Sequence, residues 1–322
     1  MYNGEKFLAE CIRSVLAQTY SNFEYTIVNN CSTDRTLEIA ESFARQDARI
    51  LIHSNSEFLS VVDNHNNAFS LIPDRAKYCK VVGADDWLFP SCIAEMVKVA
   101  EQYPSVGMVS SYVLDGLYVG WDGLPYPSTF RKGKEICRMR LLKGLKIFGG
   151  PSNSLLRSRV VKERRPFYKP GNYHGDTQAY LDLLQEHDFG FVHQVLSYNR
   201  RDEDSRSTAF LRRVNSYVVA DVEELTRFGS IYLTSEESER RLDEATKAYY
   251  RFLAQSVLEL RGKEFWDYHR ERMRQLGGID YFKLGCYLLY RIIDAILNPK
   301  RTIEGVMRRV FKRAAETSRS VT

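Results

Sequence analysis

Apolar residues in the first third of the chain fall alternately at the spacing of a helix face and of a buried strand. Residues 5–18 carry them every three or four positions, whereas residues 25–28 form a short β-rich run. The pattern predicts strands at residues 25–28, 49–53, 78–82 and 106–110, and helices at residues 5–18, 33–45, 61–69 and 90–102. Strands that alternate with helices predict an α/β fold with a mixed, mostly parallel sheet and helices on both of its faces.

Beyond residue 115 the pattern changes. Residues 144–154 are rich in glycine and small polar residues, which predicts a loop that passes close to a ligand. A predicted helix at residues 177–186 and a predicted strand at residues 189–198 follow. Only helical spacing remains from about residue 207, over residues 212–228, 236–260 and 265–276 and from residue 281. We therefore expect an α/β domain at residues 1–206 and a helical C-terminal region at residues 207–322.

Composition and charge exclude several classes of protein. The 322 residues are 44% hydrophobic and 27% charged, enough to bury a full-sized core. The net charge of +5 equals that of residues 291–322 alone, which contain eight Lys and Arg against three Asp and Glu. The rest of the chain is therefore close to neutral, and this disfavours a general nucleic-acid binder with a basic face spread over its fold. Six cysteines without a CxxC pair argue against a zinc site. The apolar stretch at residues 287–297 is too short to span a bilayer, and without a leader pattern we expect a cytoplasmic protein.

Two adjacent carboxylates, Asp85 and Asp86, directly follow the predicted strand that ends at Val82. Ligands of α/β sheets bind at the carboxyl ends of strands. Adjacent negative charges repel one another unless a cation lies between them, and Mg²⁺ or Mn²⁺ prefers oxygen ligands. A metal there would bridge to a diphosphate and stabilise its charge as a leaving group. The alternative is that one aspartate caps the helix near Pro90 and the other is solvated.

Several motifs place these carboxylates in a wider pattern. In chain order they are Tyr2-Asn3-Gly4-Glu5, Ser14-Val15-Leu16-Ala17-Gln18-Thr19-Tyr20, Asn30-Cys31-Ser32-Thr33-Asp34-Arg35-Thr36, and Ala84-Asp85-Asp86-Trp87 followed by Pro90. This order resembles the family 2 glycosyltransferases, which have the GT-A fold. The resemblance covers residues 2–115 and, more loosely, residues 145–205. It implies a nucleotide-sugar half at about residues 1–115, an acceptor half at about residues 116–206, and Mn²⁺ or Mg²⁺ held by Asp85 and Asp86.

The chain departs from the family's pattern in three places. Asn30 stands where the family usually has an aspartate that contacts the nucleoside base, and an amide offers a donor as well as an acceptor. The alternative is that Asn30 only shapes the turn. Gly83 occupies the first position of a metal motif that is often Asp-x-Asp-Asp. The family's first β-strand, which ends in Pro-x-Tyr-Asn, is missing before Asn3, so either the start lies further upstream or the chain is truncated.

Inverting transfer needs a base that takes a proton from the acceptor hydroxyl. By the resemblance this is Asp176, at the start of the helix predicted from residue 177, although the same position suits a plain N-cap. Two neighbouring arginines could grip the diphosphate or pair with Asp202, Glu203 and Asp204. The resemblance thus implies a catalytic Asp176, metal ligands Asp85 and Asp86, and substrate contacts by Asn3, Asn30, Asp86, Gly150, Asn153, Arg200 and Arg201.

These observations predict a glycosyltransferase that moves a sugar from a nucleoside-diphosphate sugar to a hydroxyl of a saccharide or lipid-linked acceptor. Inversion at the anomeric carbon and a setting in cell-surface polysaccharide or glycolipid synthesis follow from the resemblance. The basic C-terminal helices, with an apolar face, favour peripheral contact with the inner face of the membrane. The alternative there is a helical lid on the catalytic domain. Two other functions are open: a nucleotidyltransferase, and a non-catalytic descendant that binds a sugar or a partner protein.

Overall fold

A computed structural model describes residues 1–172, 174–201 and 206–298 of the chain, without the side chains of residues 206–209. The chain forms two compact units. The first contains Met1–Ser205 and Phe228–Thr234, and the second contains Arg206–Arg227 and Ser235–Thr322. The division predicted after residue 206, into an α/β domain and a helical C-terminal region, stays a prediction.

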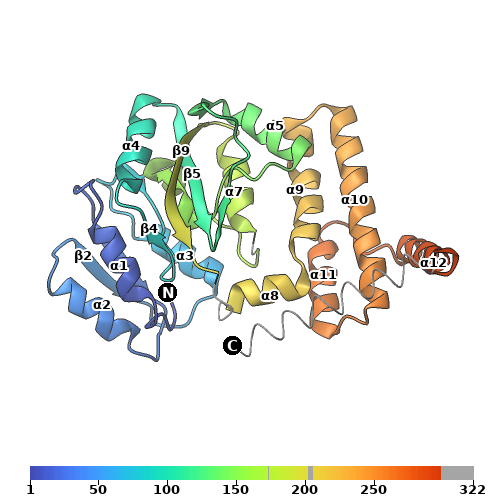
Figure 1. The fold of residues 1–322 in the computed structure, drawn as a ribbon, viewed down its shortest axis with the longest axis horizontal. Coiled ribbons are helices and arrows are strands. Elements are labelled where there is room, and N and C mark those ends of the chain that lie inside the picture. The colour runs from blue at the N-terminus through green and yellow to red at the C-terminus, as the bar shows by residue number, and fades with distance from the viewer. Residues whose placement is uncertain (173, 202–205, 299–322) are drawn as a thin grey trace. The chain divides into compact units, whose positions relative to one another are not determined.

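The first unit begins with a β-α-β arrangement preceded by a helix (Figure 1). Its elements are α1 (Leu8–Leu16), β1 (Tyr25–Asn29), α2 (Thr36–Ala44) and β2 (Ile50–Ser54). Strands β1 and β2 are parallel, with Ile27 opposite Ile52. Leu8 and Ile12 of α1 pack with Ile27 and with Ala40 of α2 in one core cluster. The predicted strands and helices of this segment are confirmed, with ends shifted by a few residues, as is usual for helix and strand termini.

The next segment contains α3 (Val61–Ser70), β3 (Tyr78–Cys79), β4 (Trp87–Leu88) and α4 (Cys92–Gln102). Ser60 caps α3, because its hydroxyl accepts a hydrogen bond from the backbone N–H of Asp63 at 3.2 Å. The predicted strand at residues 78–82 is wrong in length, since only Tyr78 and Cys79 pair with a neighbouring strand. The partner strand is short because the residues before it form a 3₁₀ turn at Pro151–Asn153.

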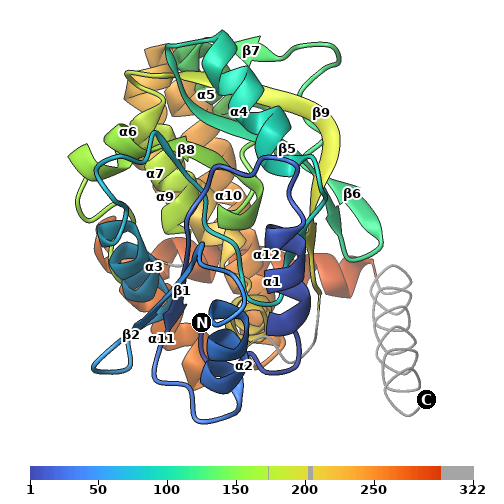
Figure 2. The same ribbon diagram turned by 90° about the vertical axis from the view of Figure 1, so that its left-hand side faces the viewer.

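A seven-stranded sheet forms the centre of the first unit, in the order β3-β8-β5-β9-β4, with β6 beside β5 and β7 beside β9. Its remaining elements are β5 (Val106–Asp115), β6 (Tyr118–Gly120), β7 (Phe130–Arg131), α5 (Gly133–Lys143), η1 (Pro151–Asn153), β8 (Leu155–Arg157), α6 (Ser158–Glu163), α7 (Gly175–Leu183) and β9 (Asp188–Asn199). The long strands β5 and β9 are parallel and end side by side at Asp115 and Asn199. Strand β6 flanks that end and β7 flanks the other (Figure 2).

The predicted mixed α/β sheet with flanking helices is confirmed, but the predicted excess of parallel pairs is wrong. Of the pairs described, β1–β2 and β5–β9 are parallel and the other five are antiparallel. Antiparallel strands can follow a short turn, whereas parallel strands need a long crossover. The turn at Gly116, with φ of 62°, returns the chain from β5 directly into β6. Spacing of apolar residues reports burial and does not report strand direction.

The described part of the second unit is mainly helical, as predicted. Its helices include α8 (Arg206–Val214), α10 (Ser235–Leu258), α11 (Lys263–Arg274) and α12 (Tyr281–Leu297), and α9 (Tyr217–Tyr232) runs from this unit into residues of the first. The helix predicted at residues 212–228 is broken at Asn215, whose φ of 49° cannot continue a right-handed helix. Buried His269 fixes this core, with its ring nitrogens 3.1 Å from the Tyr249 hydroxyl and 2.8 Å from the Val214 carbonyl. No described helix combines the length and apolar character that a membrane crossing requires.

Candidate active site

Asp85 and Asp86 lie in a tight turn between β3 and β4, where the Asp86 N–H donates to the Gly83 carbonyl at 3.0 Å. Gly83 is held from two other sides: its N–H donates to the Ser152 hydroxyl at 2.9 Å, and its carbonyl accepts from the Cys11 thiol at 3.4 Å. A Cβ at Gly83 would lie 3.0 Å from one Asp86 oxygen and 3.1 Å from one Asp85 oxygen. Both carboxylates therefore converge on the space that a glycine leaves open at this position.

Burial and the neighbouring charge raise the pKa of Asp86 to about 7. Burial is the larger cause and the Asp85 carboxylate adds to it. Hydrogen bonds from Ser152 and from the backbone N–H of Arg200, the latter at 3.1 Å, offset only part of this rise. The turn is therefore a place of poorly compensated negative charge, which is the environment that a cation relieves.

Arg200 follows β9 and binds the same turn. Its Nε donates to the Asp85 carbonyl at 3.2 Å, and its guanidinium lies 4.0 Å from the centre of the Phe7 ring and pairs with Glu10 of α1. Arg201 pairs with Asp115 at the end of β5. The predicted phosphate contacts of both arginines remain predictions, since each guanidinium is already paired with a carboxylate. The alternative pairing with Asp202, Glu203 and Asp204 lies outside the described residues.

The predicted glycine-rich loop packs directly against this turn. Gly149 has a φ of 78°, and a Cβ there would lie 2.7 Å from the Asn153 Cβ, so the loop requires glycine at this position. The Asn153 side chain is fully buried. Its Oδ1 accepts from the Gly150 N–H at 3.0 Å, and its Nδ2 donates to Ser197 at 2.7 Å. Asn153 thus fixes the loop to β9, and its predicted contact with substrate, like that of Gly150, stays a prediction.

Lys80 and Ser152 are two residues of this site that the sequence reasoning missed. The Lys80 ammonium donates to the Ser152 carbonyl at 2.7 Å and to the Ser154 carbonyl at 3.4 Å. Burial lowers the pKa of Lys80, and the Asp86 carboxylate acts in the opposite direction. A lysine just before the apolar pair Val81-Val82 was the available signal, because a charged residue in a buried run needs a partner.

Asp176 is the second residue of α7. The helix begins at Gly175 with His174 at the N-cap position, so the predicted helix start at residue 177 and the plain N-cap role of Asp176 are wrong. One Asp176 oxygen accepts from the N–H of Thr177 at 2.7 Å, and burial raises the pKa of Asp176 to about 6. Burial raises the pKa of the Tyr180 phenol, and the nearby Asp176 charge raises it further.

Tyr180 connects Asp176 to the carboxylate turn. Its hydroxyl lies 2.9 Å from the Ser154 hydroxyl, in the loop whose Ser152 binds Gly83 and Asp86. Hydrogen bonds therefore join the carboxylate turn to the loop and the loop to Tyr180 of α7, and a shared site with Asp176 stays a prediction.

Asn30 and Asn3 lie at the carboxyl end of β1. The Oδ1 of Asn30 accepts from the Leu59 N–H at 2.9 Å and from Asn55 at 2.8 Å, and its Nδ2 donates to the Leu59 carbonyl at 2.9 Å. Among the described residues these bonds use both acceptor positions of the amide and leave one N–H of Nδ2. Asn3 binds Thr33, whose N–H donates to the Asn3 Oδ1 at 2.8 Å. Ligand contacts by these two residues stay predictions.

Two further aromatic side chains of the first unit are packed. Trp87 lies between Phe89 and Tyr198, with ring centres 5.1 Å away on each side. His193 bridges the Tyr112 hydroxyl at 2.7 Å and the Ser128 carbonyl at 2.9 Å. Both side chains therefore have structural partners within the fold.

The model of glycosyl transferase family 2 matches residues 1–165. A putative glycosyltransferase, EpsE of Bacillus subtilis strain 168, is 26% identical over 226 residues, which are 68% of this chain and 76% of EpsE. The first curated relatives are matched over only 34% and 29% of their own length. The family match covers half of the chain, and the chain belongs to glycosyl transferase family 2.

Solved structures show the same fold. Staphylococcus aureus TarS 1–349, in complex with UDP-GlcNAc, has a TM-score of 0.60 at 14% identity, over 85% of this chain and 79% of TarS 1–349. The mannosyltransferase PcManGT from Pyrobaculum calidifontis, in complex with GDP-Man and Mn²⁺, has a TM-score of 0.53 at 14% identity, over 92% of this chain and 85% of PcManGT. The predicted GT-A fold is confirmed.

Proposed function

We propose that this protein transfers a sugar from a nucleoside-diphosphate sugar to a hydroxyl acceptor with inversion at the anomeric carbon. The observation that carries the proposal is the convergence of Asp85 and Asp86 over Gly83, with the pKa of Asp86 raised to about 7. The site lies beside the carboxyl ends of β5 and β9, where α/β sheets bind their ligands. Family membership and the nucleotide-sugar ligands of TarS and PcManGT support the same class of donor.

Asp85 and Asp86 would hold a divalent cation, Mn²⁺ or Mg²⁺. Within the described residues no group of three or more His, Cys, Asp and Glu could hold a metal. Two carboxylates nevertheless fit this use, because Mg²⁺ in phosphate-transferring sites is commonly held by one or two carboxylates, with substrate phosphates and water completing its shell. The metal, when bound, supplies charge neutralisation for the departing diphosphate. The Mn²⁺ complex of PcManGT supports this part of the proposal.

Asn3 and Asn30 would lie at the nucleoside end of the donor, and Asp86 would also contact donor hydroxyls. The N–H that Asn30 retains would donate to an acceptor on the base, whereas an aspartate at this position could only accept. Arg200 and Arg201 would contact the diphosphate after exchanging their present carboxylate partners. Gly150 and Asn153 would shape the loop beside the sugar.

Asp176 would act as the base. Its carboxylate takes the proton of the acceptor hydroxyl while the hydroxyl oxygen bonds to the anomeric carbon. The bond between that carbon and the diphosphate oxygen breaks, and its electron pair leaves with the diphosphate. A pKa of about 6 suits this role, because the group is ionised at neutral pH and still basic. We propose a saccharide or lipid-linked acceptor, in cell-surface polysaccharide or glycolipid synthesis.

The test is release of nucleoside diphosphate from a panel of UDP-, GDP- and dTDP-sugars, with Mn²⁺ or with EDTA. We expect release with one class of nucleotide, loss of release in EDTA, and a decrease of about 100-fold or more in Asp85→Ala. Asp122→Ala, which removes an exposed carboxylate, is the matched control and should be unchanged. Pyrophosphate release from a nucleoside triphosphate would instead identify a nucleotidyltransferase. No turnover by the wild type with any donor and acceptor would favour the non-catalytic descendant.

A further inference from the structure

Helix α12 of the second unit has one side covered and one side exposed. The covered side packs on α10, with Leu284 buried and Tyr287 stacked on Tyr250 at a ring distance of 6.2 Å. The exposed side contains large apolar residues, including Phe282 at 84% exposure and Ile296 at 70%. The other exposed positions on this side are Tyr281, Gly285, Cys286, Leu289, Tyr290, Ile292, Ile293 and Leu297.

The exposed positions form one continuous apolar face. At about 100° per residue they cover roughly half of the circumference of the helix, with a tyrosine, Tyr281 or Tyr290, at each edge. The charged residues of α12 all lie on the other half. Lys283 lies 5.0 Å from the centre of the Tyr250 ring, Arg291 donates to Gln255, and Asp294 accepts from Asn298 at 2.9 Å.

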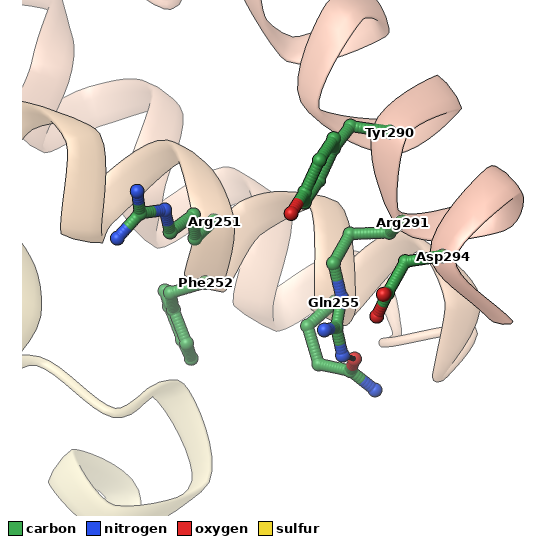
Figure 3. Close-up of a pocket in the computed structure, with 6 residues that line it drawn as sticks. All are labelled: Arg251, Phe252, Gln255, Tyr290, Arg291 and Asp294. Atoms are coloured by element: carbon green, nitrogen blue, oxygen red, sulfur yellow. Dashed lines mark hydrogen bonds between the residues drawn. The ribbon is translucent and has the colours of Figure 1, made fainter. Parts of the chain in front are cut away.

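A cavity borders one edge of this apolar face. It has a volume of about 370 Å³, lies between α10 and α12, and is lined by Arg251, Phe252, Gln255, Tyr290, Arg291 and Asp294 (Figure 3). Its lining contains the Asp294 carboxylate as well as two arginines, and the Arg251 guanidinium points away from Arg291 (Figure 3). Tyr290 belongs to both the cavity and the edge of the face, so the two features are continuous.

We propose that α12 binds peripherally to the surface of an anionic phospholipid bilayer. Its apolar half lies among the first carbons of the acyl chains, and the edge tyrosines lie at the level of the headgroups. This arrangement suits an amphipathic helix that lies in the interface and does not cross it. Tyrosine has an apolar ring and a polar hydroxyl, and therefore prefers that boundary.

A second copy of the chain is the competing occupant, and the pattern disfavours it. A helix-to-helix seam is a narrow apolar stripe with charged residues along both sides. The face of α12 is wide and has tyrosines at its edges instead. Residues 299–322, whose structure is not described, also carry seven Lys and Arg against two Asp and Glu in the sequence, which adds attraction to anionic lipid.

Flotation of the full chain with phosphatidylcholine vesicles, with and without phosphatidylglycerol, tests the proposal. We expect the wild type to bind the anionic vesicles. The double variant Leu289→Glu/Ile296→Glu should bind with a partition coefficient about tenfold or more lower, because each substitution removes apolar side-chain surface that the bilayer would otherwise bury. Leu117→Glu, which changes a leucine that is 90% exposed in the turn before β6, is the matched control and should bind as the wild type does.

Three results would overturn the proposal: no flotation of the wild type, equal flotation of the wild type and the α12 variant, or equal loss in Leu117→Glu. Light scattering distinguishes the competing occupant. A wild-type dimer that becomes a monomer in Leu289→Glu/Ile296→Glu, without vesicle binding, would assign the face to a second copy. The substituted side chains are exposed, so thermal melting should not change, and nucleoside-diphosphate release should persist in every variant.

Discussion

Replacing Asp86 by asparagine should make the metal-free protein more stable at alkaline pH while removing its metal-dependent function. The pKa of Asp86 is raised from 3.8 to about 7 by burial and by Asp85. A carboxyl group with a raised pKa in the folded state destabilises folding increasingly as pH rises from its unfolded pKa through its folded pKa. At about 1.4 kcal/mol per pKa unit, the full destabilisation above pH 7 is about 4 kcal/mol.

The pH dependence makes this prediction specific. Between pH 5 and pH 8 the Asp86 carboxyl should lower the free energy of unfolding by about 2–3 kcal/mol, because most of its ionisation in the folded protein occurs in that window. Asparagine keeps an oxygen that can accept from the Arg200 N–H, so the 3.1 Å hydrogen bond is preserved. The stabilisation of Asp86→Asn over the wild type should therefore grow by about the same 2–3 kcal/mol from pH 5 to pH 8.

Urea unfolding in EDTA at both pH values measures the difference. Asp122→Asn, at an exposed carboxyl, is the control and should follow the wild type at both pH values. If the stability of Asp86→Asn showed the same dependence on pH as that of the wild type, ionisation of Asp86 would not destabilise the folded state. The electrostatic argument for a cation at this turn would then fail.

Further substitutions test the rest of the site. Gly83→Ala should push the two carboxylates apart, since its Cβ would lie about 3 Å from both; calorimetry should show weaker Mn²⁺-dependent donor binding and a stability change within about 1 kcal/mol. Asp176→Asn should abolish transfer but keep donor binding. In the wild type, transfer should rise as pH increases through about 6 and then level off, and a flat pH profile would exclude Asp176 as the base. Lys80→Met should cost about 1–3 kcal/mol in urea unfolding, because the carbonyl of Ser152 loses its partner, and wild-type stability would contradict that contact.

The sequence predicted the elements of this fold well and their pairing poorly. Helical spacing located α1 and α10, and β-rich runs located β1 and β9, because burial on one side is visible in the order of apolar residues. Strand direction depends on which distant segment supplies the next strand. The short antiparallel strands β4 and β7 therefore could not be assigned to β9 from spacing alone.

For the site, too, residues that are neighbours in the sequence were predicted and contacts between distant segments were not. Asp85 and Asp86 were predicted because their chemistry and their neighbours in the chain are both unusual. Lys80, Ser152 and the pairing of Arg200 with α1 were missed, because they depend on contacts between segments far apart in the sequence. Asn30 was predicted as a ligand contact, whereas its amide is largely used in bonds to Leu59 and Asn55 that only the structure reveals.

Metal-dependent donor binding tests the central claim most directly. Thermal shifts of the wild type and Asp85→Ala should be measured with UDP, GDP, dTDP and their sugars, with and without Mn²⁺. A ligand at 100 times its Kd adds about 2.7 kcal/mol to the stability of the folded state. We expect stabilisation of that size by one class of nucleotide sugar, only with Mn²⁺ and only in the wild type. Equal stabilisation of Asp85→Ala, or none in the wild type with any donor, would contradict the assignment of this turn as the metal and diphosphate site.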